Sequence, residues 1–115
     1  MQPAVALKSV NMEHMTAKAA EVASLLATMA NPVRLLILCS LVEGEKPVHE
    51  LVTNSGITQG AVSQHLTKMR NLQLVSTRRD GQSIYYSIKS KEVQQLLNLL
   101  YSLYCRDSTT SGTAA

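Results

Sequence analysis

The sequence predicts a mainly α-helical domain with a β-hairpin wing, the fold class called winged helix-turn-helix, and three observations carry this prediction. Residues 48–72 hold two helical repeats of apolar residues, with a tight turn between them at Gly56. Residues 74–88 then change to an alternating pattern around Asp80-Gly81, a strong signal for a two-residue hairpin loop. Basic residues gather in the same part of the chain. The order of these features indicates the fold more strongly than any one of them.

Length and composition limit the class of protein. A chain of 115 residues suits one domain, and an apolar fraction of 45% argues against wholesale disorder. We place a flexible arm or short helix at 1–15, the domain at 16–107 and a disordered tail at 108–115. The apolar runs are shorter than the roughly 18 residues of a membrane span, and the N-terminus lacks a secretory pattern. We therefore expect a cytoplasmic protein with reducible thiols and no membrane partner.

The net charge of +3 is unevenly spread along the chain. Residues 58–91 contain six basic residues and one acidic residue, whereas the segments before and after each carry a net charge of −1. One basic third on a neutral body is typical of a protein that docks on a polyanion through one surface. The alternative is a cationic face that is merely solvated.

The helices can be placed in order. Apolar residues recur at helical spacing from Thr16 to Ala30, and Asn31-Pro32 interrupts the chain and restarts it, because Asn caps well and Pro suits the first helical position. The next helix, from Pro32 to about Val42, is apolar nearly all round and is expected at the centre of the core. A turn is expected at Gly44–Pro47, followed by a short helix over Val48–Asn54.

The second helix of the helix-turn-helix is expected to run from Thr58 to about Leu72. Gly56 suits a left-handed exit from the helix before it, and Thr58 suits its N-cap. The inward stripe of this helix is expected to comprise Val62, Leu66, Met69 and, at its edge, Leu72. His65 lies beside this stripe, so we expect it to pack or cap first, with a DNA contact as the second interpretation.

The outward face of that helix is the expected reading surface, because the N-terminal half of such a helix reaches base edges in the major groove. The residues expected there are Gln59, Gly60, Ser63 and Gln64. Gln offers a donor and an acceptor that suit adenine, and Gly60 lets backbone approach DNA closely, at about 1 kcal/mol of helix stability relative to Ala. Phosphate contacts are expected from Thr67 and Lys68, and contacts to the sugar-phosphate backbone or the adjacent minor groove from Arg78 and Arg79. Each alone is equally well explained as a solvated residue, but together they favour binding to double-stranded DNA.

The last helix has more apolar surface than one stripe needs. From Ser90 the apolar positions are Val93, Leu96, Leu97, Leu99, Leu100, Tyr101, Leu103 and Tyr104. We expect the spare face to meet a second copy of the chain, together with the first helix, although it could instead complete its own core. A two-fold homodimer is expected to read an inverted repeat.

The segment Ala30–Leu38, the helix from Gln59 to Arg70 with Ser63-Gln64-His65-Leu66, and the wing resemble the ArsR/SmtB family of bacterial repressors. The resemblance covers roughly residues 16–105. Members are typically dimers that leave their operators when an inducer binds, so the resemblance implies a dimeric transcriptional repressor. We expect no enzymatic activity, because nothing resembles a nucleophile–base pair, a phosphate loop or an open metal site.

The chain departs from the metal-sensing members of that family. Val48–Val52, where arsenic- and cadmium-type members carry a Cys-x-Cys pair, has no cysteine, and Glu92–Tyr104 has no His or Asp for a zinc-type site. Soft metals want three or four thiolate or imidazole ligands. Two cysteines and three dispersed histidines would supply these only by coincidence, so we expect no metal and no cofactor.

Cys39 in Leu-Ile-Leu-Cys-Ser-Leu and Cys105 in Leu-Tyr-Cys resemble the pair of the sulfide- and persulfide-responsive branch, the BigR/SqrR/HlyU-like regulators. There, reactive sulfur species join two thiols through a disulfide or polysulfide bridge and weaken operator binding. The resemblance implies that Cys39 and Cys105 are the sensor dithiol. The residues alone favour two packed core cysteines, because apolar surroundings raise the pKa of Cys39 and a helix C-terminus does not favour a thiolate at Cys105.

Other roles stay open on the sequence. The fold also suits a general redox- or metal-responsive ArsR-type regulator, an HlyU-like antirepressor, or a winged helix that binds only protein. The basic wing and the polar outer face argue against the last of these. A salt-dependent shift of an inverted-repeat DNA would exclude it.

Overall fold

The computed structural model describes residues 11–106, which fall into two compact units divided between Asn31 and Pro32. In the N-terminal unit, helix α2 spans Met12–Met29. Asn11 caps it, since its side chain accepts a hydrogen bond from the His14 N–H at 3.0 Å. The helix therefore begins before the apolar pattern does, and it ends before the predicted break. Residues 1–10 of the expected arm and the expected tail lie outside the described residues.

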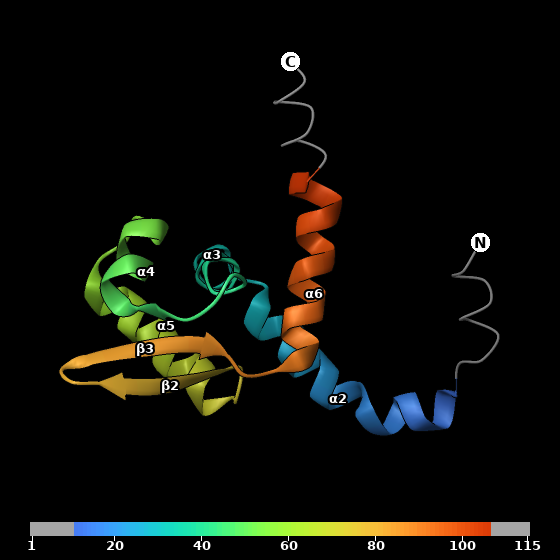
Figure 1. Ribbon diagram of the computed structural model, residues 1–115. Helices are drawn as coiled ribbons and strands as arrows, with labels where there is room; N and C mark the ends of the chain where they lie inside the picture. The colour runs from blue at the N-terminus through green and yellow to red at the C-terminus, as the bar shows by residue number, and fades with distance from the viewer. Residues whose placement is uncertain (1–10, 107–115) are drawn as a thin grey trace, which may run out of the picture. The chain divides into compact units, whose positions relative to one another are not determined.

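The C-terminal unit begins with three helices that pack on one another in sequence. Helix α3 (Pro32–Ser40) packs on α4 (Val48–Ser55), and α4 packs on α5 (Gln59–Asn71), as Figure 1 shows. The buried apolar side chains of this unit are Ile37, Leu38, Leu41, Leu51, Val62, Leu66, Met69, Leu74, Val75, Val93 and Leu97. Helix α3 is less buried than its composition predicts, because Leu36 is 51% exposed.

The turn between α4 and α5 confirms its prediction from local chemistry. Gly56 has a φ of +75°, and its N–H donates to the carbonyl of Val52 at 3.0 Å, which ends α4. The Thr58 side chain then accepts from the Ala61 N–H at 3.2 Å and caps α5. Two short helices are thus held at a fixed geometry by one glycine and one threonine.

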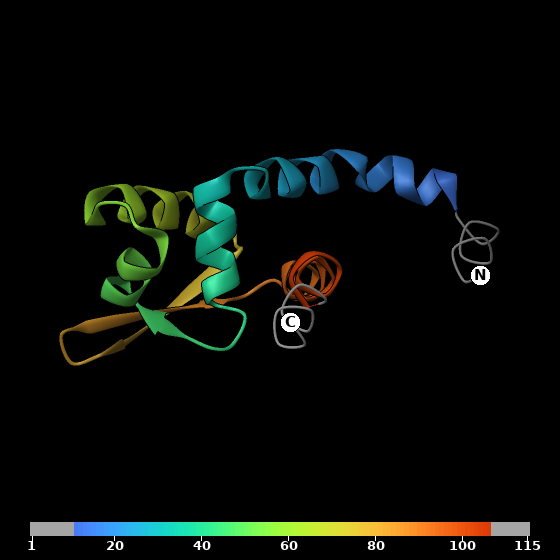
Figure 2. The same ribbon diagram turned by 90° about the horizontal axis from the view of Figure 1, so that it is seen from above.

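Three antiparallel strands follow the order β1-β3-β2: β1 is Lys46–Pro47, β2 is Val75–Asp80 and β3 is Ser83–Ile88. Figure 2 shows the short β1 beside the β2–β3 hairpin. The prediction of a plain turn at Gly44–Pro47 is wrong for its last two residues, which pair with Tyr86 and Tyr85. A strand of two residues shows no alternation, and Pro signals a turn; it is tolerated here because β1 is an edge strand.

The hairpin forms where it is predicted, but its loop is shifted by one residue. Asp80 pairs with Ser83, so the loop is Gly81-Gln82 and not Asp80-Gly81. Gly81 has a φ of +65°, as a type II′ turn requires at its first loop position. Gly81 sets the turn type, and because it occupies the first loop position, Asp80 and Ser83 are the last pair before the loop.

Helix α5 ends in a Schellman motif with glutamine in the position that glycine usually takes. Gln73 has a φ of +67°, its N–H donates to the Arg70 carbonyl at 3.0 Å, and the Leu74 N–H donates to the Met69 carbonyl at 2.9 Å. The Gln73 side chain accepts a hydrogen bond from the ammonium group of Lys89. This contact ties the end of α5 to the segment that leaves β3.

The last helix changes its winding near its end. Helix α6 (Lys91–Tyr101) is capped by Ser90, whose hydroxyl accepts from the Val93 N–H at 3.2 Å, and a π-helical segment, η1 (Ser102–Arg106), continues it. The sequence pattern does not predict this change, because a π-helix has no periodic signal of its own over five residues. Among residues 11–106 no single helix is long and apolar enough to cross a membrane.

Candidate nucleic-acid interface and cysteine pair

The outward face of α5 is polar, exposed and unused by the protein itself. The residues predicted to lie there are all exposed: Gln59, Gly60, Ser63, Gln64, Thr67 and Lys68. Within residues 11–106 none of their side chains makes a hydrogen bond, so their donors and acceptors stay available to a ligand. The opposite side of the helix is held rigidly by the buried Val62, Leu66 and Met69. This arrangement presents a row of hydrogen-bonding groups on a fixed support, as base reading requires.

Gly60 is not needed by the fold. A Cβ built at this position meets no atom within 4 Å, and its φ lies outside the left-handed region. Neither packing nor backbone conformation therefore requires glycine in the first turn of α5. A glycine here lowers helix stability and leaves the backbone open to close approach.

His65 lies half-buried beside the apolar stripe, as predicted. Burial lowers the pKa of its imidazole, and the positive charges of Arg34 and Lys68 lower it further. This shift favours the neutral form of the ring. Its two basic neighbours add to the positive potential of this side of the unit.

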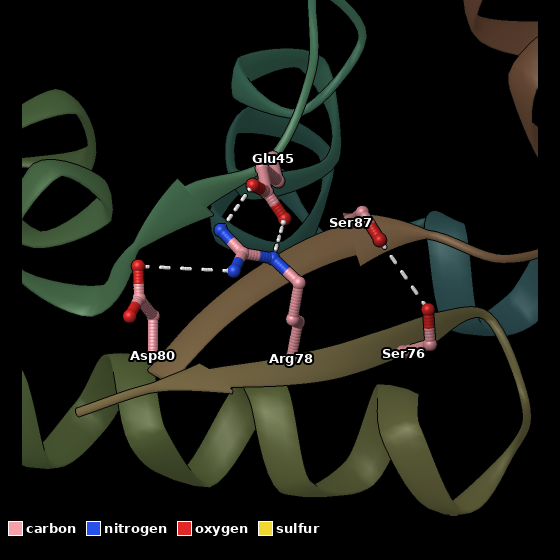
Figure 3. A network of polar contacts seen from close by, with 5 residues as sticks. All are labelled: Glu45, Ser76, Arg78, Asp80 and Ser87. Carbon is pink, nitrogen blue, oxygen red and sulfur yellow. Dashed lines mark hydrogen bonds and ion pairs between the residues drawn. The ribbon is translucent and has the colours of Figure 1, made fainter. Parts of the chain in front are cut away.

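The two wing arginines, both predicted to contact DNA, differ in their surroundings. Arg79 is exposed and has no ion-pair partner among the described residues. Arg78 is also exposed, but it donates from Nε to Glu45 Oε1 at 3.0 Å and from Nη2 to Glu45 Oε2 at 2.6 Å, as Figure 3 shows. Its Nη1 lies 3.9 Å from Asp80 Oδ2, and its guanidinium carbon lies 4.9 Å from the centre of the Tyr85 ring.

Sequence reasoning does not find Glu45 as the partner of Arg78. The two residues are 33 positions apart, and no periodicity links them. The Arg78 hydrogen bond lowers the pKa of the Glu45 carboxyl, and the positive charge of Arg78 lowers it further, so the ionised form of the carboxyl is favoured. Glu45 directly precedes β1, and it lies at the wing because β1 pairs with β3. The sequence pattern does not predict β1.

The two cysteines lie in different elements and interact through charge. Cys39 is near the end of α3 and Cys105 is in η1; both are exposed and neither forms a disulfide. Burial by surrounding atoms raises the pKa of the Cys39 thiol although the residue as a whole is exposed, and negative charge on Cys105 raises it further. The fold therefore brings the two thiols within range of each other's charge. In the part of the chain from 11 to 106, no three His, Cys, Asp or Glu side chains gather into a set able to hold a metal ion.

The sequence is similar to those of known bacterial regulators. The sequence profile of the bacterial regulatory proteins of the arsR family matches residues 31–77. The biofilm growth-associated repressor of Xylella fastidiosa is 44% identical over 81% of this chain and 82% of its own length. The chain belongs to the ArsR family. It is thus a DNA-binding transcriptional regulator and not an enzyme.

Solved structures of ArsR-family relatives have the same fold. The crystal structure of the transcriptional repressor BigR from Xylella fastidiosa matches with a TM-score of 0.77 and 43% identity over 84% of this chain and 98% of that one. Reduced HlyU from Vibrio cholerae matches with a TM-score of 0.78 and 40% identity over 82% of this chain and 99% of that one. The same organism's HlyU, described as a transcriptional activator, is 41% identical over 84% of this chain and 89% of its own length. These matches confirm the winged helix-turn-helix.

Proposed function

We propose that this ArsR-family regulator is a dimeric repressor that senses reactive sulfur species, persulfides and polysulfides, through a dithiol made of Cys39 and Cys105. The observation that carries the proposal is that both thiols are free and exposed within the same compact unit. The raised pKa of Cys39, caused first by burial and second by the charge of Cys105, supports it. Both residues are exposed, so a small reactant reaches them from solvent. The relative HlyU, solved in a form described as reduced, supports a redox state as a property of such regulators.

The raised pKa of Cys39 sets the order of the reaction. Because burial and the charge of Cys105 raise the pKa of the Cys39 thiol and favour its protonated form, we assign the first attack to the thiolate of Cys105. This thiolate attacks the outer sulfur of a persulfide R–S–SH, releases R–S⁻ and becomes a persulfide itself. The Cys39 thiol then loses its proton to solvent and attacks the Cys105 sulfur, so that a disulfide forms and hydrosulfide leaves.

A longer bridge forms when the Cys105 persulfide takes up a second sulfur first. Its terminal sulfur attacks another R–S–SH and again releases R–S⁻; Cys39 then attacks the middle sulfur, displaces hydrosulfide and leaves a trisulfide. A direct disulfide needs Cα atoms within about 7 Å, whereas a bridge with added sulfur spans a wider gap. Peroxide adds no sulfur, which gives the sensor a physical basis for preferring persulfides.

The proposal includes a homodimer that dimerises through the first and last helices. Large apolar side chains are exposed on α2 at Met12, Met15, Val22 and Leu26, and at the end of α6 and in η1 at Leu99, Tyr101, Leu103 and Tyr104. Exposed apolar surface of this extent is typical of subunit interfaces. A two-fold dimer presents two α5 helices to an inverted repeat of double-stranded DNA in the cytoplasm.

Repression is the sign of regulation that needs the fewest additional contacts. A dimer seated on promoter DNA excludes other proteins from it, whereas activation or antirepression also needs a partner to recruit or displace. The relatives' descriptions include both a repressor and an activator. A general redox- or metal-responsive regulator and an HlyU-like antirepressor are the competing functions.

The test uses an operator duplex selected from random DNA by the reduced full-length protein. Reduced protein is expected to bind it and to release it after treatment with glutathione persulfide, while Cys39→Ser and Cys105→Ser stay bound. Mass spectrometry is expected to find a Cys39–Cys105 bridge with added sulfur after persulfide but not after peroxide. Release by both variants contradicts the dithiol, equal disulfide yields without added sulfur contradict the selectivity, and failure of reduced protein to select any DNA contradicts repression.

A further inference from the structure

Arg78 spans the whole width of the three-stranded sheet. It lies on β2 directly opposite Tyr85 of the central strand β3, and Tyr85 in turn lies opposite Pro47 of β1. The guanidinium lies over the Tyr85 ring and reaches Glu45, two residues before Pro47. One side chain on one outer strand is therefore joined, across the middle strand, to the segment that leads into the other outer strand.

The donors of this guanidinium are already directed at partners in the protein. Nε and Nη2 form a two-pronged pair with the Glu45 carboxylate, and Nη1 faces Asp80. Planar, two-pronged pairing of this kind fixes the orientation of both groups. A DNA phosphate that took Arg78 would have to displace Glu45 and would then lie beside a carboxylate of the same charge.

The Glu45–Arg78 pair lies where few backbone hydrogen bonds join the wing to the helix-turn-helix. The backbone pairing between β1 and the hairpin covers only Lys46 and Pro47, and Pro47 has no N–H to donate. Pro47 is also the N-cap residue of α4, the first helix of the helix-turn-helix. The Glu45–Arg78 pair therefore adds a side-chain link between the wing and the segment on which α4 and α5 are built.

We infer that Glu45 and Arg78 are positioning residues that hold the wing at a fixed place relative to the helix-turn-helix, and that Arg79, not Arg78, gives the phosphate contact of this part of β2. Figure 3 shows Arg78 and Ser76 rising from one side of the strands, with α5 on the other side. Arg79, one residue on, points to the opposite side of the sheet from Arg78, as alternation along a strand requires. The inference does not depend on the cysteine chemistry.

Equilibrium binding to the operator duplex over a range of salt concentrations distinguishes the two roles. Arg78→Gln and Glu45→Gln are each expected to weaken binding about three- to tenfold, with an unchanged dependence of log affinity on log salt concentration. The double variant is expected to have an affinity no lower than that of the single variant with the lower affinity, because either change alone already breaks the Glu45–Arg78 pair. Arg79→Gln, the matched control, is expected to reduce the salt slope by about 0.9, the value for one lost phosphate contact.

Glu45→Gln is the decisive variant. It removes a negative charge, so general electrostatic attraction to DNA predicts tighter binding, whereas loss of a positioning link predicts weaker binding. Tighter or unchanged binding of Glu45→Gln, or a salt slope reduced by about 0.9 in Arg78→Gln, overturns the inference and makes Arg78 the phosphate contact. Thermal unfolding of each variant, expected to match the wild type closely, confirms that binding is compared between folded proteins.

Discussion

The outer face of α5 and the wing are both exposed and polar, but they differ in whether their side chains already have partners within the protein. On α5 the side chains of the expected reading residues make no hydrogen bonds within residues 11–106, and the buried stripe beneath them holds the helix in place. On the wing, Arg78 is bound to Glu45, Asp80 and Tyr85, whereas its neighbour Arg79 has no ion-pair partner within residues 11–106. Exposure and charge therefore do not by themselves identify a DNA contact; the partners that a side chain already has decide its role.

The largest expected effect tests the support beneath α5. Leu66 is fully buried, so Leu66→Ala should lower the free energy of unfolding by about 2–5 kcal/mol through lost burial and the cavity left behind. Urea denaturation measures it. The matched control is Leu72→Ala at the end of the same helix, where the side chain is 43% exposed and a loss within about 1 kcal/mol is expected. Equal losses would mean that the stripe does not fix the helix.

A smaller effect, on binding alone, is expected for the reading face. Gln64→Ala should weaken operator binding by about 1–3 kcal/mol, roughly 5- to 150-fold, because a two-pronged contact to a base is lost. Stability should change by no more than about 0.5 kcal/mol, since Gln64 is exposed. Asn71→Ala, exposed in the last turn of α5, is the control and should leave sequence preference unchanged. Unaltered binding of Gln64→Ala would remove this residue from the interface.

Gly60→Ala separates the demands of folding from those of binding. The substitution meets open space and should stabilise the unbound protein by about 1 kcal/mol through helix propensity. The added methyl group should at the same time weaken operator binding, if DNA approaches the first turn of α5 as closely as the glycine allows. Thermal unfolding and fluorescence anisotropy measure the two effects. Higher stability with unchanged affinity would show that DNA keeps its distance here.

The smallest expected effect concerns the cysteines. Because the pKa of Cys39 is raised, its rate of alkylation by iodoacetamide should rise with pH through a midpoint above that of an ordinary cysteine. Cys105→Ser removes the coupled charge, so the midpoint should fall, although the contribution of burial keeps it raised. Mass spectrometry of the Cys39 peptide follows the reaction. A midpoint that does not move in Cys105→Ser would mean that the thiols are too far apart to interact.

Local chemistry made much of the fold predictable. Gly56, Thr58 and Gly81 act within a few residues of themselves, so the turn, the cap and the hairpin could be placed from the sequence, the hairpin loop within one residue. What could not be predicted depends on distant partners. Strand β1 is too short to leave a pattern and forms only because β3 pairs with it, and Glu45 becomes a partner of Arg78 only through β1.

The same distinction applies to the candidate site. The exposed residues of α5 follow from helical periodicity, and the structure leaves them where the pattern puts them. The two cysteines are 66 positions apart, and only the packing of the C-terminal unit brings their charges into range. A resemblance to a family was therefore needed to pair them, because no periodicity along the chain does so.

The π-helical winding of η1 changes how positions at the end of the chain are counted. Each of its hydrogen bonds encloses one residue more than an α-helical bond does, so the segment turns less per residue than the helix before it. A helical wheel drawn from Ser90 at 3.6 residues per turn therefore rotates Cys105 too far around the axis. A single-residue deletion within 102–104 would move this cysteine to a different side of the helix while leaving the composition of the segment almost unchanged. An alignment that scores residues but not winding would miss the difference.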